Sequence, residues 1–206
     1  MPVIVVANPK GGVGKSTLAT NLAGAYARAG HAVMLGDVDR QQSARQWLML
    51  RPAALPTIRG WDLARDEVVR PPKGTTHVVL DTPAGLHGSK LDDVMRIADR
   101  VIVPLQPSLF DIQASHAFVL ALRAHKRSDK VRLGVVGMRV REGTIASDQL
   151  RHFLDALGAP VLGMLRDTQL YVQLAARGAT LWDIAPSRAE RDLAQWQPLL
   201  AWLDRA

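Results

Sequence analysis

Cysteine is absent from the 206 residues of the chain. Its absence excludes disulfide bonds, zinc sites built on thiolates, iron–sulfur clusters and thiol nucleophiles. Long apolar runs are also lacking, since none approaches the roughly 20 residues that a helix needs to span a bilayer. An apolar segment that we expect to be a strand begins at Val3, which leaves no room for a signal peptide. We therefore expect a cytosolic protein.

Internal repeats and low-complexity tracts are missing as well, so the chain has to form its own hydrophobic core. Hydrophobic residues make up 48% of the sequence. A chain of this size can bury enough of them to form one sizeable core without help from disulfides or metals. We therefore predict a single domain over residues 1–206.

Short apolar runs alternate with amphipathic stretches along the whole chain. This alternation is typical of strand–helix units that form a mostly parallel, twisted sheet with helices on both faces. The expected strands are 3–8, 32–37, 77–81, 100–105, 131–138 and 160–165, with a minor strand at 57–61. The expected helices are 15–29, 41–50, 89–98, 111–126, 147–157 and 168–177. The predicted fold class is therefore α/β.

A glycine-rich segment, Pro9-Lys10-Gly11-Gly12-Val13-Gly14-Lys15-Ser16-Thr17, joins the first expected strand to the first expected helix. Its glycines allow successive backbone N–H groups and the start of the helix to converge on phosphate oxygens. In such a loop Lys15 reaches the β- and γ-phosphates, and the Ser16 hydroxyl binds Mg²⁺. The segment therefore predicts a P-loop NTPase fold, with a nucleotide site formed by Gly11, Gly12, Val13, Gly14, Lys15, Ser16 and Thr17.

Two other interpretations of this segment are a tight strand-to-helix connection and a dinucleotide-binding turn of the G-x-G-x-x-G kind. A tight turn does not require the Lys15-Ser16 ending, and the dinucleotide fingerprint does not contain it. The P-loop is therefore the better interpretation.

Three carboxylates are expected at the carboxyl edge of the sheet, where ligands bind in such folds. Asp81 ends an expected strand, in the position of a Walker B carboxylate that holds the water shell of magnesium. Asp37 and Asp39 flank Val38 at the end of the second expected strand. Each alone could be a turn or capping residue. With the P-loop, we expect one of this pair to face the metal and the other the attacking water.

At this point the motifs resemble a known family. The extra lysine Lys10 before the glycine pair, the D-x-D of Asp37 and Asp39, and Asp81-Thr82-Pro83 look like those of the ParA/MinD family of deviant Walker A ATPases. The resemblance is closest to small ParA-type positioning ATPases and extends over the whole chain. It implies an ATP-dependent homodimer in which Lys10 of each copy reaches the phosphates bound by the other.

The resemblance also implies roles for individual residues. Lys10, Lys15 and Asp39 would be catalytic, and Asp39 would position or activate the water. Ser16, Asp37 and Asp81 would serve Mg²⁺. Two positions depart from the family pattern: Arg40 replaces the proline that usually follows the D-x-D, and Met138-Arg139 stands where relatives carry an asparagine that reads adenine. Adenine would then be bound near Met138 and by backbone groups near Pro186.

Basic residues are in excess, with a net charge of +7. An anionic partner and general solubility both explain this excess. Basic residues concentrate between 123 and 141, where Asp129 is the one acid. The resemblance implies non-specific duplex DNA as a partner, with contacts from Arg166, Arg177, Arg188 and Arg191, and with Lys126, Arg127 and Lys130 as weaker candidates.

A membrane anchor of the MinD type is the alternative for the final stretch of the chain. This stretch places Ala189, Leu193, Trp196, Leu200 and Leu203 on one face, is interrupted by Pro198, and carries about one net negative charge. An anchor requires lysines there, so a helix that docks its apolar face on the protein is the better interpretation, with no membrane partner.

The leading hypothesis is a nucleoid-associated ATPase that positions or segregates a plasmid, a chromosome or a protein cluster. A ParB-like or cargo-adaptor protein would stimulate its hydrolysis. Two alternatives remain: a biosynthetic P-loop enzyme similar to dethiobiotin or cobyrinate synthetase, and a MinD-like membrane-associated regulator of cell division.

Overall fold

A single parallel sheet forms the centre of the computed structural model, which describes residues 1–61 and 71–205, without the side chains of residues 109–111. The strand order is β3-β2-β4-β1-β5-β6-β7, and each neighbouring pair is parallel. The strands are β1 (Val3–Val6), β2 (Val33–Asp37), β3 (Ile58–Trp61), β4 (His77–Asp81), β5 (Arg100–Leu105), β6 (Arg132–Val140) and β7 (Val161–Arg166). The predicted seven strands are all present among these residues.

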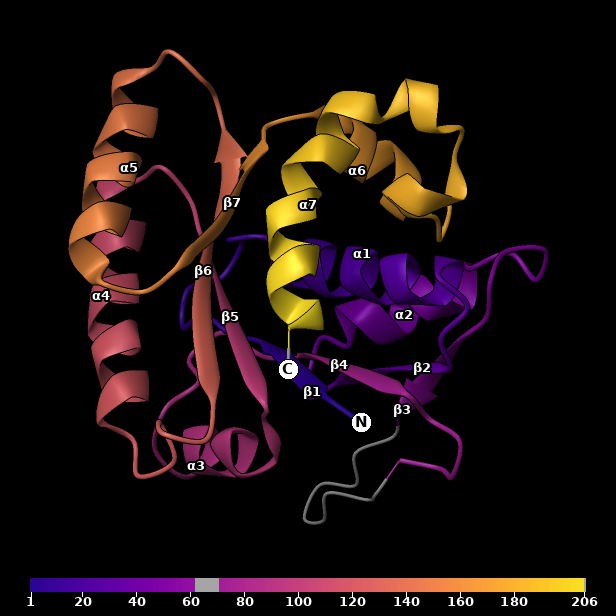
Figure 1. Cartoon of the computed structure of the whole chain (residues 1–206), viewed down its shortest axis with the longest axis horizontal. Helices are drawn as coiled ribbons and strands as arrows, with labels where there is room; N and C mark the ends of the chain where they lie inside the picture. Colours follow the sequence, from indigo (N-terminus) through magenta and orange to yellow (C-terminus); the bar gives the residue numbers. More distant parts are fainter. Residues whose placement is uncertain (62–70, 206) are drawn as a thin grey trace.

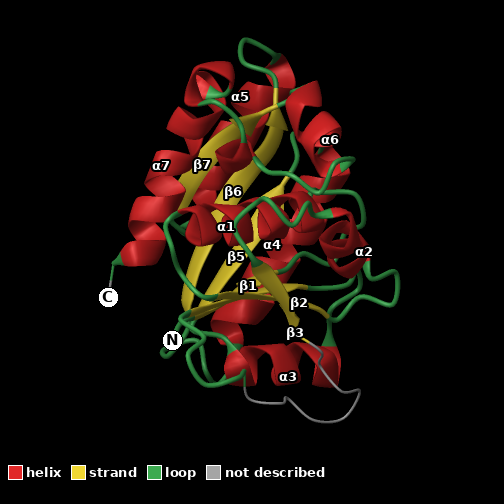
Figure 2. Cartoon of the chain, turned by 90° about the vertical axis from the view of Figure 1, so that its right-hand side faces the viewer, coloured by secondary structure: helices red, strands yellow, loops and turns green. Residues whose placement is uncertain are grey.

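Helices cover both faces of this sheet, as Figures 1 and 2 show. Their bounds are α1 (Lys15–Arg28), α2 (Ser43–Leu50), α3 (Gly88–Ile97), α4 (Leu109–Ala124), α5 (Ile145–Leu157), α6 (Gln169–Ala175) and α7 (Glu190–Asp204). Two short 3₁₀ turns, η1 (Leu181–Asp183) and η2 (Pro186–Arg188), join α6 to α7. The α/β class and the parallel sheet predicted from the sequence are therefore confirmed.

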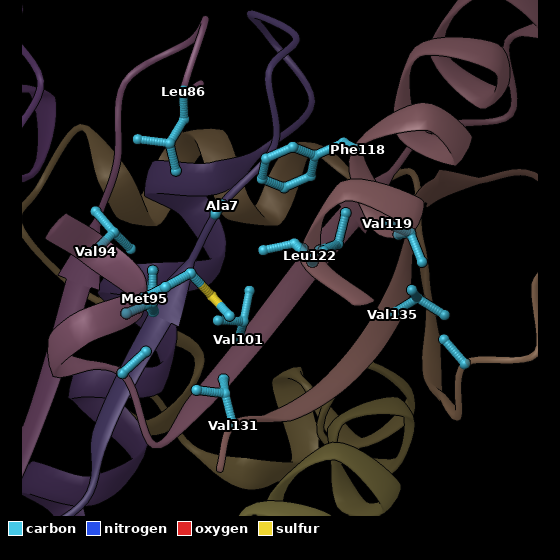
Figure 3. Close-up of a cluster of buried hydrophobic side chains, with 14 of the residues drawn as sticks. Ala7, Leu86, Val94, Met95, Val101, Phe118, Val119, Leu122, Val131 and Val135 are labelled. Atoms are coloured by element: carbon cyan, nitrogen blue, oxygen red, sulfur yellow. The ribbon is translucent and has the colours of Figure 1, made fainter. Parts of the chain in front are cut away.

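Successive residues of β1 alternate between two hydrophobic cores, because neighbouring side chains of a strand point to opposite faces. Val3, Val5 and Ala7 belong to a core formed with α3, α4 and α5. Ile4 and Val6 belong to the other core, formed with α1, α2, α6 and α7. Figure 3 shows the first core, where Phe118, Val119 and Leu122 of α4 pack with Ala7 and Leu86.

The last helix differs from the prediction. Pro198 lies inside α7 and does not interrupt it. The proline lacks an N–H, but packing compensates, since Trp196, Leu199 and Leu203 are almost fully buried against the sheet. The buried face therefore includes Leu199, which the sequence pattern left out, whereas Leu193 and Leu200 are only partly buried against it.

Candidate nucleotide-binding site

Strand register brings the predicted carboxylates beside the glycine-rich loop. Asp81 at the end of β4 pairs with Asp37 of β2 on one side and with Val6 of β1 on the other. The glycine-rich segment begins at Pro9, three residues after Val6, so Asp81 ends the strand beside this segment and Asp37 ends the next strand along the sheet. The structure therefore assembles at one edge of the sheet residues that are far apart in the sequence.

The loop curves over the start of α1 with left-handed glycines. Gly12 has a φ of 76° and Gly14 a φ of 96°, which residues with a side chain adopt only at an energetic cost. A Cβ on Gly14 would also lie 2.8 Å from Cε of Met138, whereas a Cβ on Gly11 or Gly12 would meet no atom within 4 Å. The side chain of Met138 therefore packs against the loop at Gly14, whereas the space beside Gly11 and Gly12 is open.

Lys15 lies largely buried at the start of α1, and its amine donates a hydrogen bond to the carbonyl oxygen of Lys10 at 2.7 Å. Burial lowers the pKa of Lys15, while the charges of Asp81 and Asp39 oppose this change. The ammonium is thus held inside the loop, close to the carboxylates. It does not extend into solvent.

Asp81 is a deeply buried carboxylate of the site, and one of its oxygens has no partner among the described residues. Its side chain is 1% exposed, and among the described residues Oδ1 finds no hydrogen-bond partner. Burial raises the pKa of Asp81 to about 7, although a hydrogen bond with the Ser16 side chain lowers it, and the charge of Asp37 adds to the increase. An unpaired buried carboxylate oxygen needs a proton, a water or a cation.

Asp37 binds the backbone of the segment that follows it. Its Oδ1 accepts from the Asp39 amide at 2.9 Å, and its Oδ2 accepts from the Ala44 and Arg45 amides at the start of α2, at 2.8 and 3.2 Å. Asp39 in turn accepts from the Gln41 amide at 3.0 Å. The turn that contains Arg40 is therefore held by the two carboxylates from which it starts.

The residues present fit a magnesium nucleotide. Backbone N–H groups at the start of α1 and the Lys15 ammonium provide positive charge for phosphates. The unpartnered Asp81 oxygen, the Ser16 hydroxyl and the adjacent Asp37 provide the hard oxygen ligands that Mg²⁺ prefers. Ser16 and Asp81 would hold the ion and its waters, with Asp37 beside them.

The residues expected near adenine differ in how exposed they are to solvent. Met138 is buried beneath Gly14, so its side chain supports the loop. Arg139 is exposed and has a φ of 52°, at a point where the pairing of β6 with β7 shifts register. Pro186 is exposed in η2. A role for Met138 and Pro186 in adenine binding stays a prediction.

Sequence reasoning missed three residues that shape the loop. Asn8 is fully buried and its Oδ1 accepts from the Lys10 amide at 2.9 Å. The Gln106 side-chain amide donates to the Gly12 carbonyl at 2.8 Å, and the Gly85 amide donates to the Pro9 carbonyl at 2.8 Å. Asn8 is the last residue of the expected strand 3–8, and Gln106 directly follows the strand 100–105. Their position at the carboxyl edge of the sheet is the one sequence signal that could have identified them.

Comparison with known proteins decides the family of this site. The model of the CobQ/CobB/MinD/ParA nucleotide binding domain matches residues 4–181. The chain belongs to this family. The predicted resemblance to ParA and MinD proteins and the predicted P-loop NTPase fold are therefore confirmed, and the predicted ATPase activity agrees with the family.

Individual relatives of this ParA/MinD chain have related names. Maintenance of carboxysome distribution protein A of Gloeobacter kilaueensis is 41% identical over 116 residues, which are 53% of this chain and 51% of that protein. The match thus spans about half the length of this relative. Two solved structures are similar in fold, each with a TM-score of 0.75. An ATP complex of Cyanothece McdA is 14% identical, with 98% of this chain and 96% of that chain covered. A plasmid partition protein of Borrelia burgdorferi B31 with AMPPNP is 16% identical, with 97% of this chain and 98% of that chain covered.

The basic window of this ParA/MinD chain has a structural role that its composition did not reveal. Arg123 donates to the carbonyls of Leu157 and Gly158 at the end of α5. Arg127 donates to the Met95 carbonyl near the end of α3. These guanidinium groups therefore bind the carbonyl ends of helices, where cations are favoured. Lys126 and Lys130 remain exposed.

The end of α7 is held in the same way. Arg132 donates to the carbonyls of Trp202 and Arg205 at 3.2 and 2.5 Å, and its guanidinium lies 4.6 Å from the centre of the Trp202 ring. Arg100 donates to the Arg205 carbonyl at 2.6 Å. The helix is thus fixed along its apolar face and at its end. Within the described ranges, no helix is long and apolar enough to cross a bilayer.

The four predicted DNA-contacting arginines fall into two kinds. Arg166 forms a two-pronged ion pair with the buried Asp192 at 2.6 and 2.8 Å, and Arg191 pairs with the exposed Glu142 at 2.8 Å. Arg177 and Arg188 are exposed, and no ion pair joins them to another described residue. Arg177 and Arg188 are therefore the better available for a polyanion.

Proposed function

We propose that this chain is an ATPase that dimerises around ATP, binds DNA without sequence preference and positions cargo. The observation that carries the proposal is the second lysine, Lys10, in a P-loop that faces the paired strand ends of Asp37 and Asp81. A single P-loop lysine is sufficient to bind a triphosphate. A second lysine has a purpose if it neutralises phosphate charge held by another copy of the chain.

The residues of one copy have separate tasks in this proposal. The loop amides and Lys15 would bind the phosphates, and Ser16, Asp37 and Asp81 would hold Mg²⁺, whose charge would offset that of the phosphates. Asp39 orients the attacking water. Its carboxylate already interacts with Lys15 and Asp81 through charge, as its contributions to their pKa values indicate.

Asp37 connects this chemistry to a change of shape. Its Oδ2 now accepts from the first amides of α2. A carboxylate that turns toward the water shell of Mg²⁺ would weaken these bonds and free the turn at Arg40 to rearrange. Nucleotide state would then alter the surface around α2, as a protein that dimerises only with ATP requires.

DNA binding is proposed for Arg177, which follows α6, and Arg188, in η2, which are both exposed. Phosphate contacts need only a few cations in each copy, because a dimer doubles them and counterion release supplies the affinity. The cargo that we favour is a protein assembly, since the 41% identical relative is named for carboxysome distribution. A partner protein bound to that cargo would stimulate hydrolysis and release.

Co-sedimentation with sheared duplex DNA and with anionic liposomes, in ATP and in ADP, tests the proposal. We expect ATP-dependent, salt-sensitive binding to DNA and none to liposomes. Binding to liposomes alone would favour a MinD-like regulator, and absence of both would favour a biosynthetic enzyme. Asp39→Ala should trap the dimer on DNA, so rapid ATP turnover in this variant would contradict the role of Asp39.

Two double variants that remove the same amount of charge locate the DNA face. Arg177→Ala/Arg188→Ala should weaken DNA binding and reduce the slope of log affinity against log salt by about 0.9 for each phosphate that is no longer neutralised. Lys126→Ala/Lys130→Ala removes two exposed lysines after α4 and should leave the slope nearly unchanged. The reverse result would move the DNA face to the lysines.

A further inference from the structure

We propose that Asn8 is the positioning residue for Lys10: its buried side chain fixes the backbone from which the lysine reaches a second copy of the chain. This role rests on the proposed function, in which Lys10 acts across a dimer. Asn8 is not one of the residues that bind the nucleotide through the loop amides, and no motif of the sequence pointed to it.

The side chain of Asn8 joins three segments of the chain. Its Oδ1 accepts from the Lys10 amide at 2.9 Å, while its Nδ2 donates to the Pro104 carbonyl at 2.7 Å and to Oγ of Ser115 at 2.9 Å. Asn8 and Ser115 are both fully buried. The first bond links residues two apart, as in the turns that asparagine side chains form.

The orientation of this amide is fixed by its partners. Pro104 offers only a carbonyl oxygen, and Lys10 offers an N–H, so the amide has to place its nitrogen toward Pro104 and its oxygen toward Lys10. The reverse orientation would oppose two oxygens and two donors in a buried place. The position of Lys10 is therefore specified by the end of β5 and by α4, which packs on the core of Figure 3.

Both backbone groups of Lys10 are bound in this arrangement. Asn8 accepts from its N–H, and the Lys15 ammonium donates to its carbonyl oxygen at 2.7 Å. The residue before it, Pro9, is held through its carbonyl by the Gly85 amide at 2.8 Å. The Cα of Lys10 thus has little freedom, and the lysine side chain starts from a fixed point and direction.

A fixed start matters more for Lys10 than for the rest of the loop. The phosphate cradle consists of many amides within one copy, whereas contact with a second copy depends on the placement of one long side chain. Holding the Lys10 backbone in advance fixes the point from which this side chain starts and removes the backbone-ordering cost from dimerisation. Removal of the Asn8 acceptor should therefore impair the dimer more than the binding of nucleotide to one copy.

The test compares Asn8→Ala, Asn8→Ser and Lys10→Ala with the unchanged full chain. Nucleotide affinity is measured with fluorescent ADP, and dimerisation by analytical ultracentrifugation with Mg²⁺ and ATP. Asn8→Ala removes all three side-chain hydrogen bonds of Asn8 in each copy, including the one that holds the Lys10 amide. It should weaken the ATP dimer by about tenfold or more and change the ADP affinity less than about twofold. Asn8→Ser keeps an acceptor for the amide two residues on and should recover part of the dimer.

Tyr171→Phe is the matched control for lost stability. It removes a buried side-chain hydrogen bond, from Trp196 Nε1 to the Tyr171 hydroxyl at 2.9 Å, far along the chain from the loop. It should lower the melting temperature without a change in dimerisation. If Tyr171→Phe and Asn8→Ala impair the dimer equally, the role of Asn8 is only structural and the proposal is wrong.

The remaining outcomes separate this proposal from the proposed function. A normal ATP dimer in Asn8→Ala beside a defective one in Lys10→Ala would overturn the positioning role alone. Equal losses of ADP affinity and dimerisation in Asn8→Ala would also overturn it, because Asn8 would then support the whole cradle. An unchanged chain that stays monomeric with ATP would overturn the proposed function and the role of Asn8 with it.

Discussion

At the scale of single residues, the glycines of the chain differ in what a side chain would meet. Gly14 and Gly30 both have left-handed φ values, 96° and 87°. An added Cβ at Gly14 meets Met138 at 2.8 Å, but at Gly30 it meets no atom within 4 Å. The two positions therefore separate backbone strain from a steric clash at the site.

We predict that Gly14→Ala abolishes measurable nucleotide binding and destabilises the fold by about 2–3 kcal/mol, from strain plus the clash. Gly30→Ala should lower the free energy of unfolding by about 1 kcal/mol through strain alone and leave nucleotide affinity unchanged. Denaturant titration and binding of fluorescent nucleotide measure both. Because Met138→Ala also leaves a cavity in the core, the clash is tested by a double-mutant cycle: Gly14→Ala/Met138→Ala should lose less stability than the sum of the two single variants, and additive losses would show that Met138 does not cause the clash.

Asp81 permits a second prediction, because its pKa is raised to about 7 by burial. The unfolded chain releases this proton at lower pH than the folded chain does, so Asp81 reduces stability as pH rises from about 4 to 7, and by a constant amount above. Asp81→Asn should remove this penalty and stabilise the nucleotide-free protein at pH 8 by on the order of 1–3 kcal/mol.

The same variant should lose the contribution of magnesium to nucleotide binding. We expect ATP affinity to fall by about tenfold or more in Mg²⁺ and to change little in EDTA, because the amide replaces a charged oxygen ligand. Isothermal titration in both buffers measures the difference. An Asp81→Asn protein that keeps the full effect of Mg²⁺ would remove Asp81 from the metal site.

Some features of the site could be predicted from the sequence and others could not. The placement of the glycine-rich loop and of Asp37 and Asp81 at one edge of the sheet was predictable, because a P-loop needs particular residues at fixed spacing and because strand ends share an edge; their roles toward nucleotide and metal stay predictions. The hydrogen bonds of Asn8 were not, since they join residues 8, 104 and 115 through folding alone. The bonds from Asp37 to the start of α2 likewise depend on the turn at Arg40, for which the family pattern offered no guide.

At the scale of elements, α2 and the 3₁₀ turn η1 are joined by a buried ion pair. Arg51 follows α2 and donates to both carboxylate oxygens of Asp183 at 2.9 and 3.1 Å. The two side chains are 5% and 1% exposed. Arg51 also donates to the carbonyls of Pro56 and Gly178. This pair therefore connects the segment after Asp37 with the one that carries Arg177 and Arg188.

We predict that Arg51→Met lowers the free energy of unfolding by about 3–5 kcal/mol, because it leaves the Asp183 carboxylate buried without its partner. The exposed pair of Arg96 with Asp93 is the matched control, and Arg96→Met should change stability by less than about 0.5 kcal/mol. Urea titration of both variants gives the comparison. Similar small effects would mean that water reaches Asp183 and replaces the arginine.

Element boundaries were well predicted where packing and periodicity agreed. The strands 77–81 and 100–105 match β4 and β5. The continuity of α7 through Pro198 was not predictable, because local preference opposes it and burial of Trp196 and Leu199 decides it. Tertiary packing therefore overrides the local signal where a large apolar face is buried.

At the scale of the whole molecule, stability should depend on pH through His77 at the start of β4. Burial and then the neighbouring His31 lower the pKa of His77 to about 4, and its ring stacks on Tyr26 with centroids 4.2 Å apart. The unfolded chain binds a proton at His77 near pH 6.5, whereas the folded chain binds it only near pH 4. The contribution of neutral His77 to the free energy of unfolding is therefore complete above about pH 6.5 and is lost as pH falls from about 6.5 to 4.

We predict that His77→Phe, which keeps an aromatic ring beside Tyr26, flattens the dependence of the melting temperature on pH between about 6.5 and 4. Exposed His152 on α5 provides the control, and His152→Phe should retain the slope of the unchanged chain. Differential scanning calorimetry across this range measures both. Equal slopes for all three proteins would show that other groups cause the dependence.

The arginines that bind the ends of α3, α5 and α7 also affect the long-range electrostatic field of the molecule. Net charge counts every guanidinium as an independent unit, but Arg123, Arg127 and Arg132 each face the negative pole of a helix dipole. Their field is partly cancelled before it reaches solvent. A chain with a sequence pI near 10.4 can therefore exert a weaker long-range pull on polyanions than its amino-acid composition indicates.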